Sequence, residues 1–143
     1  MLQLIGVAVS VAVMGSAARA AGPRHSACEG PTAETVVSYV DSWDDVLRFY
    51  RGFGVCIDGS VAEGLSDRIQ RLWIERWETL PRMMTLTDGD SNCRAFVWLR
   101  IGDETFPRDS FLRLVELAST KCPPEAKEFC AAVLEEAAND TAK

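Results

Sequence analysis

The spacing of apolar residues constrains this fold more than any other feature of the sequence. In segments separated by proline and glycine, apolar residues recur every three or four positions, which places them along one face of a helix. A half-buried strand would instead alternate apolar and polar residues with a period of two. The first such face consists of Val36, Val40, Trp43, Leu47 and Tyr50. This pattern predicts one helix from Thr32 that ends at Gly52 and Gly54.

A second helix is predicted from Ser60, where the chain reads Ser-Val-Ala-Glu. Ser60 and Glu63 match the capping box, in which the serine accepts a hydrogen bond from the third helical amide and the glutamate bonds the serine amide. The stretch from Cys56 could also be read as a phosphate-binding loop or a reactive thiol. A phosphate loop needs several glycines and a lysine, and the charges of Asp58 and Glu63 oppose thiolate formation. Helix capping is therefore the favoured interpretation.

Beyond the second helix, the sequence predicts a short helical turn and a third helix. Residues 80–86 predict the turn, and Asp90 or Ser91 can cap the helix that follows. Residues 95–101 could alternatively form a buried strand, because short apolar runs do not distinguish the two structures. The sequence offers no second strand to pair with such a run, which favours the helix.

Two more helices complete the predicted fold. The fourth begins near Pro107 or Arg108, and Pro123 and Pro124 separate it from a fifth. Proline is tolerated in the first turn of a helix, so this pair can end one helix and begin the next. Five short helices with short connections predict an all-α fold, a compact bundle held by one or two disulfides.

The N-terminal residues set the domain organisation. Residues 1–20 hold an apolar run shorter than the roughly 20 residues needed to span a bilayer, and they end in Ala-Arg-Ala. These features predict a secretory signal peptide cleaved after Ala20, with a membrane anchor as the alternative. Residues 21–31 hold two glycines and two prolines and predict a flexible lead-in. We expect the helical domain to cover residues 32–139, with a frayed tail at 140–143, in a periplasmic or secreted protein.

The chain is acidic, which bears on its partners. Its formal net charge is −6, and removal of the signal peptide takes away Arg19 and no carboxylate, which makes the charge −7. This charge disfavours a nucleic acid or an anionic membrane surface, because both require a basic face. It favours a basic protein partner, although acidity also simply increases solubility.

Acidic residues in predicted turns are the candidate binding residues, because loops carry function more often than core positions do. They are Asp58, Asp88, Asp90, Asp103 and Glu104. Solvation of turn residues is the simpler explanation for the same five positions. In the functional interpretation, an acidic loop enters the cleft of a basic partner.

Five cysteines follow the predicted signal peptide, and in an exported chain they are read first as disulfide partners. Cys122 and Cys130 flank the proline pair, where antiparallel helices bring Cα atoms within the disulfide range of about 4.4–6.8 Å. For a second disulfide we prefer Cys28–Cys93, because both lie at the same end of an up-down bundle. Cys56–Cys93 is nearly as good, and the preferred pairing leaves Cys56 over. The odd thiol is either free or paired between two chains of a homodimer.

No catalytic motif is evident in the sequence. The single histidine, His25, lies in the predicted lead-in, and no metalloprotease, nucleophile-elbow or phosphate-loop motif occurs. We therefore predict no enzymatic activity, no cofactor and no metal site. One alternative is an enzyme that uses Glu63 and Asp67, although this i,i+4 spacing is common on solvated helices. Another is a structural or small-molecule-binding module with an apolar pocket. That pocket would lie around Trp73, Trp77, Met83 and Met84.

The chain resembles two groups of exported bacterial proteins. Its size, its signal peptide, its helical pattern and the corner CPPEAKEFC look like small periplasmic immunity proteins of type VI secretion systems. That resemblance implies a helical protein that protects a bacterium from a cell-wall amidase toxin, and it carries over no site residues. The block C-x-D-G-x-x-A-E-G-x-S-D from Cys56 resembles uncharacterised exported proteins of proteobacteria. Enzymes that act on the anionic cell wall present basic clefts, so we expect a binding or inhibitory protein for a basic cell-wall hydrolase.

Overall fold

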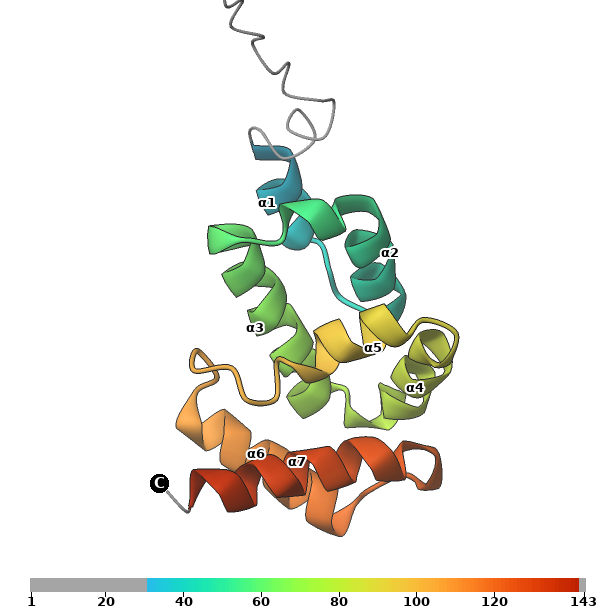
Figure 1. Cartoon of the computed structure of the whole chain (residues 1–143), viewed down its shortest axis with the longest axis vertical. Coiled ribbons are helices and arrows are strands. Elements are labelled where there is room, and N and C mark those ends of the chain that lie inside the picture. The colour runs from blue at the N-terminus through green and yellow to red at the C-terminus, as the bar shows by residue number, and fades with distance from the viewer. Residues whose placement is uncertain (1–30, 142–143) are drawn as a thin grey trace, which may run out of the picture.

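The computed structural model describes residues 31–141, and all regular structure in that range is helical (Figure 1). The α-helices are α1 (Pro31–Val37), α2 (Trp43–Phe53), α3 (Gly59–Glu75), α4 (Leu80–Asp88), α5 (Ser91–Trp98), α6 (Arg108–Thr120) and α7 (Lys127–Asp140). Short 3₁₀ turns are η1 (Gly54–Cys56), η2 (Trp77–Thr79) and η3 (Pro124–Ala126). The all-α class is confirmed, with seven α-helices in the described range where about five were predicted. The strand alternative for residues 95–101 is wrong, because α5 and the turn after it contain them.

The single helix predicted from Thr32 to the glycines at 52 and 54 is in fact two helices, α1 and α2, separated at residues 38–42. Ser42 has extended backbone and caps α2. Its hydroxyl accepts a hydrogen bond from the Asp45 amide at 3.2 Å and donates one to the Asp45 carboxylate at 2.7 Å. Asp45 takes the place that glutamate has in a capping box, but its carboxylate accepts from the Ser42 hydroxyl and the Asp41 amide rather than from the Ser42 amide. Because a cap residue must leave the helical conformation, the apolar face continues across the break while the helix does not.

The capping box predicted at Ser60 and Glu63 is wrong. Helix α3 begins one residue earlier, at Gly59, so Ser60 lies inside its first turn. Gly59 has a φ of +47°, a left-handed conformation that favours glycine, and this allows the early start. The Ser60 hydroxyl instead donates a hydrogen bond to Glu34 of α1, with 2.5 Å between the two oxygens.

The helix boundaries in the C-terminal half largely follow the sequence. Helix α4 is a full helix of nine residues with Pro81 in its first turn, where only a short turn was predicted. Asp90 caps α5 by accepting a hydrogen bond from the Cys93 amide at 2.9 Å, which confirms the cap. Helix α7 continues to Asp140, one residue beyond the predicted end.

Helices α6 and α7 pack against each other at one end of the molecule, and α1 lies at the opposite end (Figure 1). The core between them centres on Trp73 of α3, which is fully buried. The centroid of its ring lies 5.2 Å from that of Phe129 on α7 and 6.3 Å from those of Trp43 and Phe106. Aromatic pairs of this kind contribute about 0.5–1.5 kcal/mol each beyond the burial of their area. The cluster therefore ties α2, α3, α7 and the loop before α6 together.

The cysteines confirm one prediction and correct the other. Cys122 and Cys130 form a disulfide with Cα atoms 6.2 Å apart. Cys93 is a free thiol, so both pairings proposed for it, Cys28–Cys93 and Cys56–Cys93, are wrong. It lies one turn before Val97 on the buried face of α5, directed into the core. Cys56 is itself disulfide-bonded and is not left over. Cys28 lies outside the described residues.

The signal peptide predicted at residues 1–20 and most of the lead-in predicted at residues 21–31 also lie outside the described residues. Pro31, at the end of that lead-in, is the first residue of α1. Among residues 31–141, no helix combines the length and the apolar character that crossing a membrane requires.

Candidate functional site

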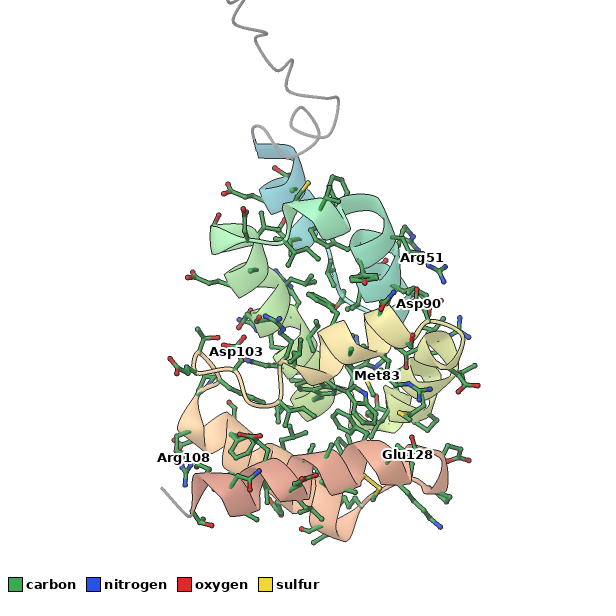
Figure 2. The ribbon with its side chains drawn as sticks, in the orientation of Figure 1. Arg51, Met83, Asp90, Asp103, Arg108 and Glu128 are labelled. Atoms are coloured by element: carbon green, nitrogen blue, oxygen red, sulfur yellow. A yellow bond between two sulfur atoms is a disulfide. The ribbon has the colours of Figure 1, made fainter. Side chains whose placement is uncertain are left out.

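The five acidic candidates do not form one site. Asp58 precedes α3, Asp88 and Asp90 lie at the turn between α4 and α5, and Asp103 and Glu104 lie in the loop before α6. Figure 2 shows Asp90 and Asp103 on opposite sides of the molecule. The structure therefore separates the candidates into distinct places on the surface.

Three of the candidates have structural roles. Asp90 caps α5, and its carboxylate also lies 4.0 Å from the Arg51 guanidinium. Asp88 forms an ion pair with Arg94 at 2.9 Å. Asp58 is the N-cap residue of α3 and is exposed, without a side-chain bond to the helix. These positions support the simpler explanation, in which turn acids are solvated or terminate helices.

The remaining two candidates border a hollow of about 220 Å³, which we call the acidic hollow. It lies between the loop before α6, the start of α6 and the C-terminal half of α7. Its lining residues are Ile101, Gly102, Asp103, Glu104, Phe106, Arg108, Phe111, Glu136 and Asp140. In Figure 2, Asp103 and Arg108 mark this side of the molecule.

The floor of the acidic hollow is apolar and continuous with the core. Ile101, Phe106 and Phe111 are all buried. The rings of Phe106 and Phe111 meet edge to face with centroids 5.8 Å apart, and Phe106 also contacts Trp73. Because these rings are part of the packed core, the floor is held rigidly.

Asp103 is fixed in place by several donors. Its carboxylate accepts hydrogen bonds from the Thr105 amide at 3.0 Å, the Thr105 hydroxyl at 2.8 Å and the Ser66 hydroxyl at 3.1 Å. The Arg100 guanidinium lies 3.5 Å away. Burial acts to raise the pKa of Asp103, but these hydrogen bonds and the Arg100 charge outweigh it, and the net pKa is lowered. The carboxylate is therefore ionised at neutral pH, with its charge already compensated.

The rim residues from α7 differ from Asp103. Asp140 forms an ion pair with Arg108. Glu136 is half-buried, and its carboxylate oxygen lies only 3.2 Å from where a Cβ atom on Gly102 would be. Neither Glu136 nor the exposed Glu104 has a hydrogen-bond or ion-pair partner among residues 31–141. Four carboxylates and one guanidinium give the hollow a formal charge of −3.

The sequence did not predict three of the residues that line the acidic hollow, Arg108, Glu136 and Asp140. The two acids are four residues apart on α7, so they share one face of the helix. That spacing alone does not indicate which loop the face meets. Only the packing of α7 against α6 places it beside residues 101–106.

A larger groove of about 500 Å³ lies at the other end of α7, and we call it the corner groove. It is lined by Pro81, Met84, Thr85, Asp88, Arg94, Pro124, Glu125, Lys127 and Glu128. Its lining includes three carboxylates and two cationic side chains, so its formal charge is only −1. The Arg94 guanidinium is 2.9 Å from Asp88 and 3.9 Å from Glu128, so its charge is met within the groove.

The geometry does not favour a carboxylate enzyme built on Glu63 and Asp67. Both side chains are exposed, and Asp67 forms an ion pair with Arg71 at 3.1 Å. Within residues 31–141, no three acids, histidines or cysteines lie where they could hold a metal ion.

The space proposed for an apolar pocket is filled by side chains. Trp73 and Met83 are both buried, and the indole nitrogen of Trp73 donates a hydrogen bond to the Met83 sulfur at 3.4 Å. The indole of Trp77 donates a hydrogen bond to the Lys121 carbonyl at 2.8 Å. A void of about 10 Å³ borders Met83, which is about the space of one water molecule.

Comparisons with protein-family models, with curated proteins and with solved structures find no match to this chain. The acidic hollow is therefore the observation from which a function can be proposed.

Proposed function

We propose that this chain is an exported protein-binding domain that inhibits its partner, most concretely an immunity protein against a basic cell-wall hydrolase. The acidic hollow carries the proposal. Its lining residues carry a formal charge of −3, or −2 once Arg100 beside Asp103 is counted, over a rigid apolar floor. Pockets for small molecules usually measure about 300–1,000 Å³, whereas this hollow measures about 220 Å³. Its size suits part of a protein partner better than a free ligand.

The charge of the whole molecule supports a basic partner. The chain carries 21 acidic and 15 basic residues. Complementary charge accelerates association and disfavours wrong partners, more than it adds affinity. An enzyme that acts on the anionic cell wall carries a basic cleft, and an acidic inhibitor would be drawn to it.

The disulfide chemistry supports export. The Cys122–Cys130 disulfide and the disulfide-bonded Cys56 suit an oxidising compartment such as the periplasm. A cell-wall hydrolase acts in that same compartment, so inhibitor and enzyme would meet there.

The test mixes the purified chain, its tag removed, with hydrolases encoded by neighbouring genes under non-reducing conditions. The tag is removed so that it cannot cover the acidic hollow, which Asp140 at the end of α7 helps to line. We expect one hydrolase to co-elute with the chain at fixed stoichiometry in size-exclusion chromatography and to lose activity on peptidoglycan. The chain alone gives the oligomeric state as a control. If no hydrolase binds at micromolar concentrations, the proposal is wrong.

A further inference from the structure

We propose that the acidic hollow is a socket for one arginine side chain of the protein partner. This inference rests on the proposed function, because it names the group through which the partner is recognised. A packed apolar floor, two carboxylates without partners among residues 31–141 and the electrostatics of α7 each point to the same occupant.

The unpaired carboxylates define the charge of the occupant. Glu136 is half-buried against Gly102 and lacks a partner among residues 31–141, as does Glu104. A carboxylate that loses water without gaining a donor is destabilised. This cost applies to the half-buried Glu136 and not to the exposed Glu104, and an incoming cation with several N–H donors would remove it on binding.

The position of these acids on α7 gives a second, independent indication. The C-terminal end of a helix carries partial negative charge and favours cations. The last turn of α7 contains no basic residue, and Glu136 and Asp140 lie near this end. Acids placed against the local electrostatic preference are typical of functional positions. Arg108 already supplies a cation to Asp140, so a bound cation would offset the unfavourable position of Glu136.

The shape of the hollow selects arginine over a small inorganic cation. Its floor of Ile101, Phe106 and Phe111 would pack against the methylene groups of a long side chain whose head stays polar. A guanidinium presents a planar fork that bonds a carboxylate through two N–H groups, which an ammonium group cannot do. Arg108 shows that a guanidinium can reach this rim, since one of its nitrogens pairs with Asp140. Glu136 remains for a second guanidinium.

The first test measures partner affinity with Glu136→Gln and with Glu135→Gln as the matched control. Both positions lie on α7 and lose one charge, but Glu135 is exposed and lies outside the hollow. We expect Glu136→Gln to weaken binding at least tenfold and Glu135→Gln to change it less than twofold. Equal affinity of Glu136→Gln and the original chain would overturn the socket while leaving the proposed function intact.

The second test needs no partner and separates the two proposals. The chain is titrated with N-acetyl-arginine amide and followed by amide chemical shifts, with the norleucine analogue as the neutral control and the lysine analogue as the cationic one. We expect shifts concentrated at residues 101–106 and 136–140, strongest for arginine, and lost in Glu136→Gln. Equal shifts with norleucine or lysine, or shifts elsewhere, would contradict an arginine socket. A failed partner search with a positive titration would instead contradict only the proposed function.

Discussion

The two hollows at opposite ends of α7 differ in whether their charged side chains are paired with opposite charges. The corner groove is more than twice as large, yet its arginine is matched by carboxylates in the same groove. The acidic hollow is small and keeps two carboxylates without partners among the described residues. In Figure 2, Glu128 and Arg108 mark these two ends. Unmet charge over a rigid floor indicates a binding surface more directly than volume does.

The ends of α7 also differ in how they are held. Near the corner groove, Phe129 is fully buried and its ring lies near those of Trp73, Trp77 and Trp98. The Cys122–Cys130 disulfide fixes the same end to α6. The other end contributes rim residues such as Glu136 and Asp140, which are exposed or half-buried. We therefore expect stability to depend on the corner end and binding to depend on the hollow end.

The largest expected effect is that of Phe129→Ala. Removing a fully buried aromatic side chain typically costs about 3–5 kcal/mol, through lost transfer free energy and the cavity that remains. Leu134→Ala on the same helix is the control, because Leu134 is among the exposed apolar residues and should cost well under half as much. Urea denaturation measures both free energies of unfolding. Similar losses for the two variants would show that the corner end has no special structural role.

Removal of the corner disulfide should cost somewhat less. The Cys122–Cys130 disulfide closes a short loop with a sequence separation of 8, so the chain-entropy model gives about 2–3 kcal/mol. The double variant Cys122→Ala, Cys130→Ala is compared with the original chain by urea denaturation and by partner affinity. We expect lower stability with unchanged affinity. A loss of affinity in the folded variant would show that the corner also belongs to the binding surface.

Asp103 tests whether a compensated charge in the hollow behaves like an uncompensated one. Its folded-state pKa is lowered, so its contribution is fully present above the unfolded value of about 3.9 and is lost as pH falls through the folded value. We expect Asp103→Asn to cost about 1.5–3 kcal/mol at pH 7, because its hydrogen bonds are made to a charged group. The difference from the original chain should shrink as the pH falls below about 4.

Unfolding curves at several pH values measure this dependence. Affinity of Asp103→Asn for the partner should fall less than that of Glu136→Gln, because Asp103 is already bonded to Ser66 and Thr105. A pH-independent cost would mean that the Asp103 charge does not contribute to folding.

Local features of the structure were predictable from the sequence, and features that depend on packing were not. The Asp90 cap and the Cys122–Cys130 disulfide each involve residues within eight positions of one another. The break before α2 has a local signal that was missed, because Ser42 is a favoured N-cap residue whose hydroxyl accepts from the Asp45 amide, but the continuous apolar face favoured one helix. The sequence did not predict which distant segments pack against one another.

The acidic hollow shows that limit most clearly. Asp103 and Glu104 could be chosen as turn acids, but Glu136 lies more than thirty positions later on a helix. Whether its face meets the loop before α6 or solvent depends on how α7 packs against α6, and no local pattern encodes that rotation. The free thiol of Cys93 has the same explanation, because the pairing argument needed the bundle topology and the actual helix face points inward.

The smallest expected effect gives the sharpest comparison of the two ends of α7. Glu128 lies in the first turn, where the helix dipole favours an acid, and Glu136 lies near the last turn, where it disfavours one. Glu128→Gln should therefore lower the free energy of unfolding by about 0.3–1 kcal/mol, and Glu136→Gln should raise it by a few tenths to 1 kcal/mol. Thermal and urea unfolding at low salt measure both, and high salt should reduce both changes. Opposite signs, together with weaker partner binding by Glu136→Gln, would mean that the chain keeps a destabilising carboxylate for recognition. A loss of stability in Glu136→Gln would instead assign that carboxylate a structural role and remove the electrostatic argument for the socket.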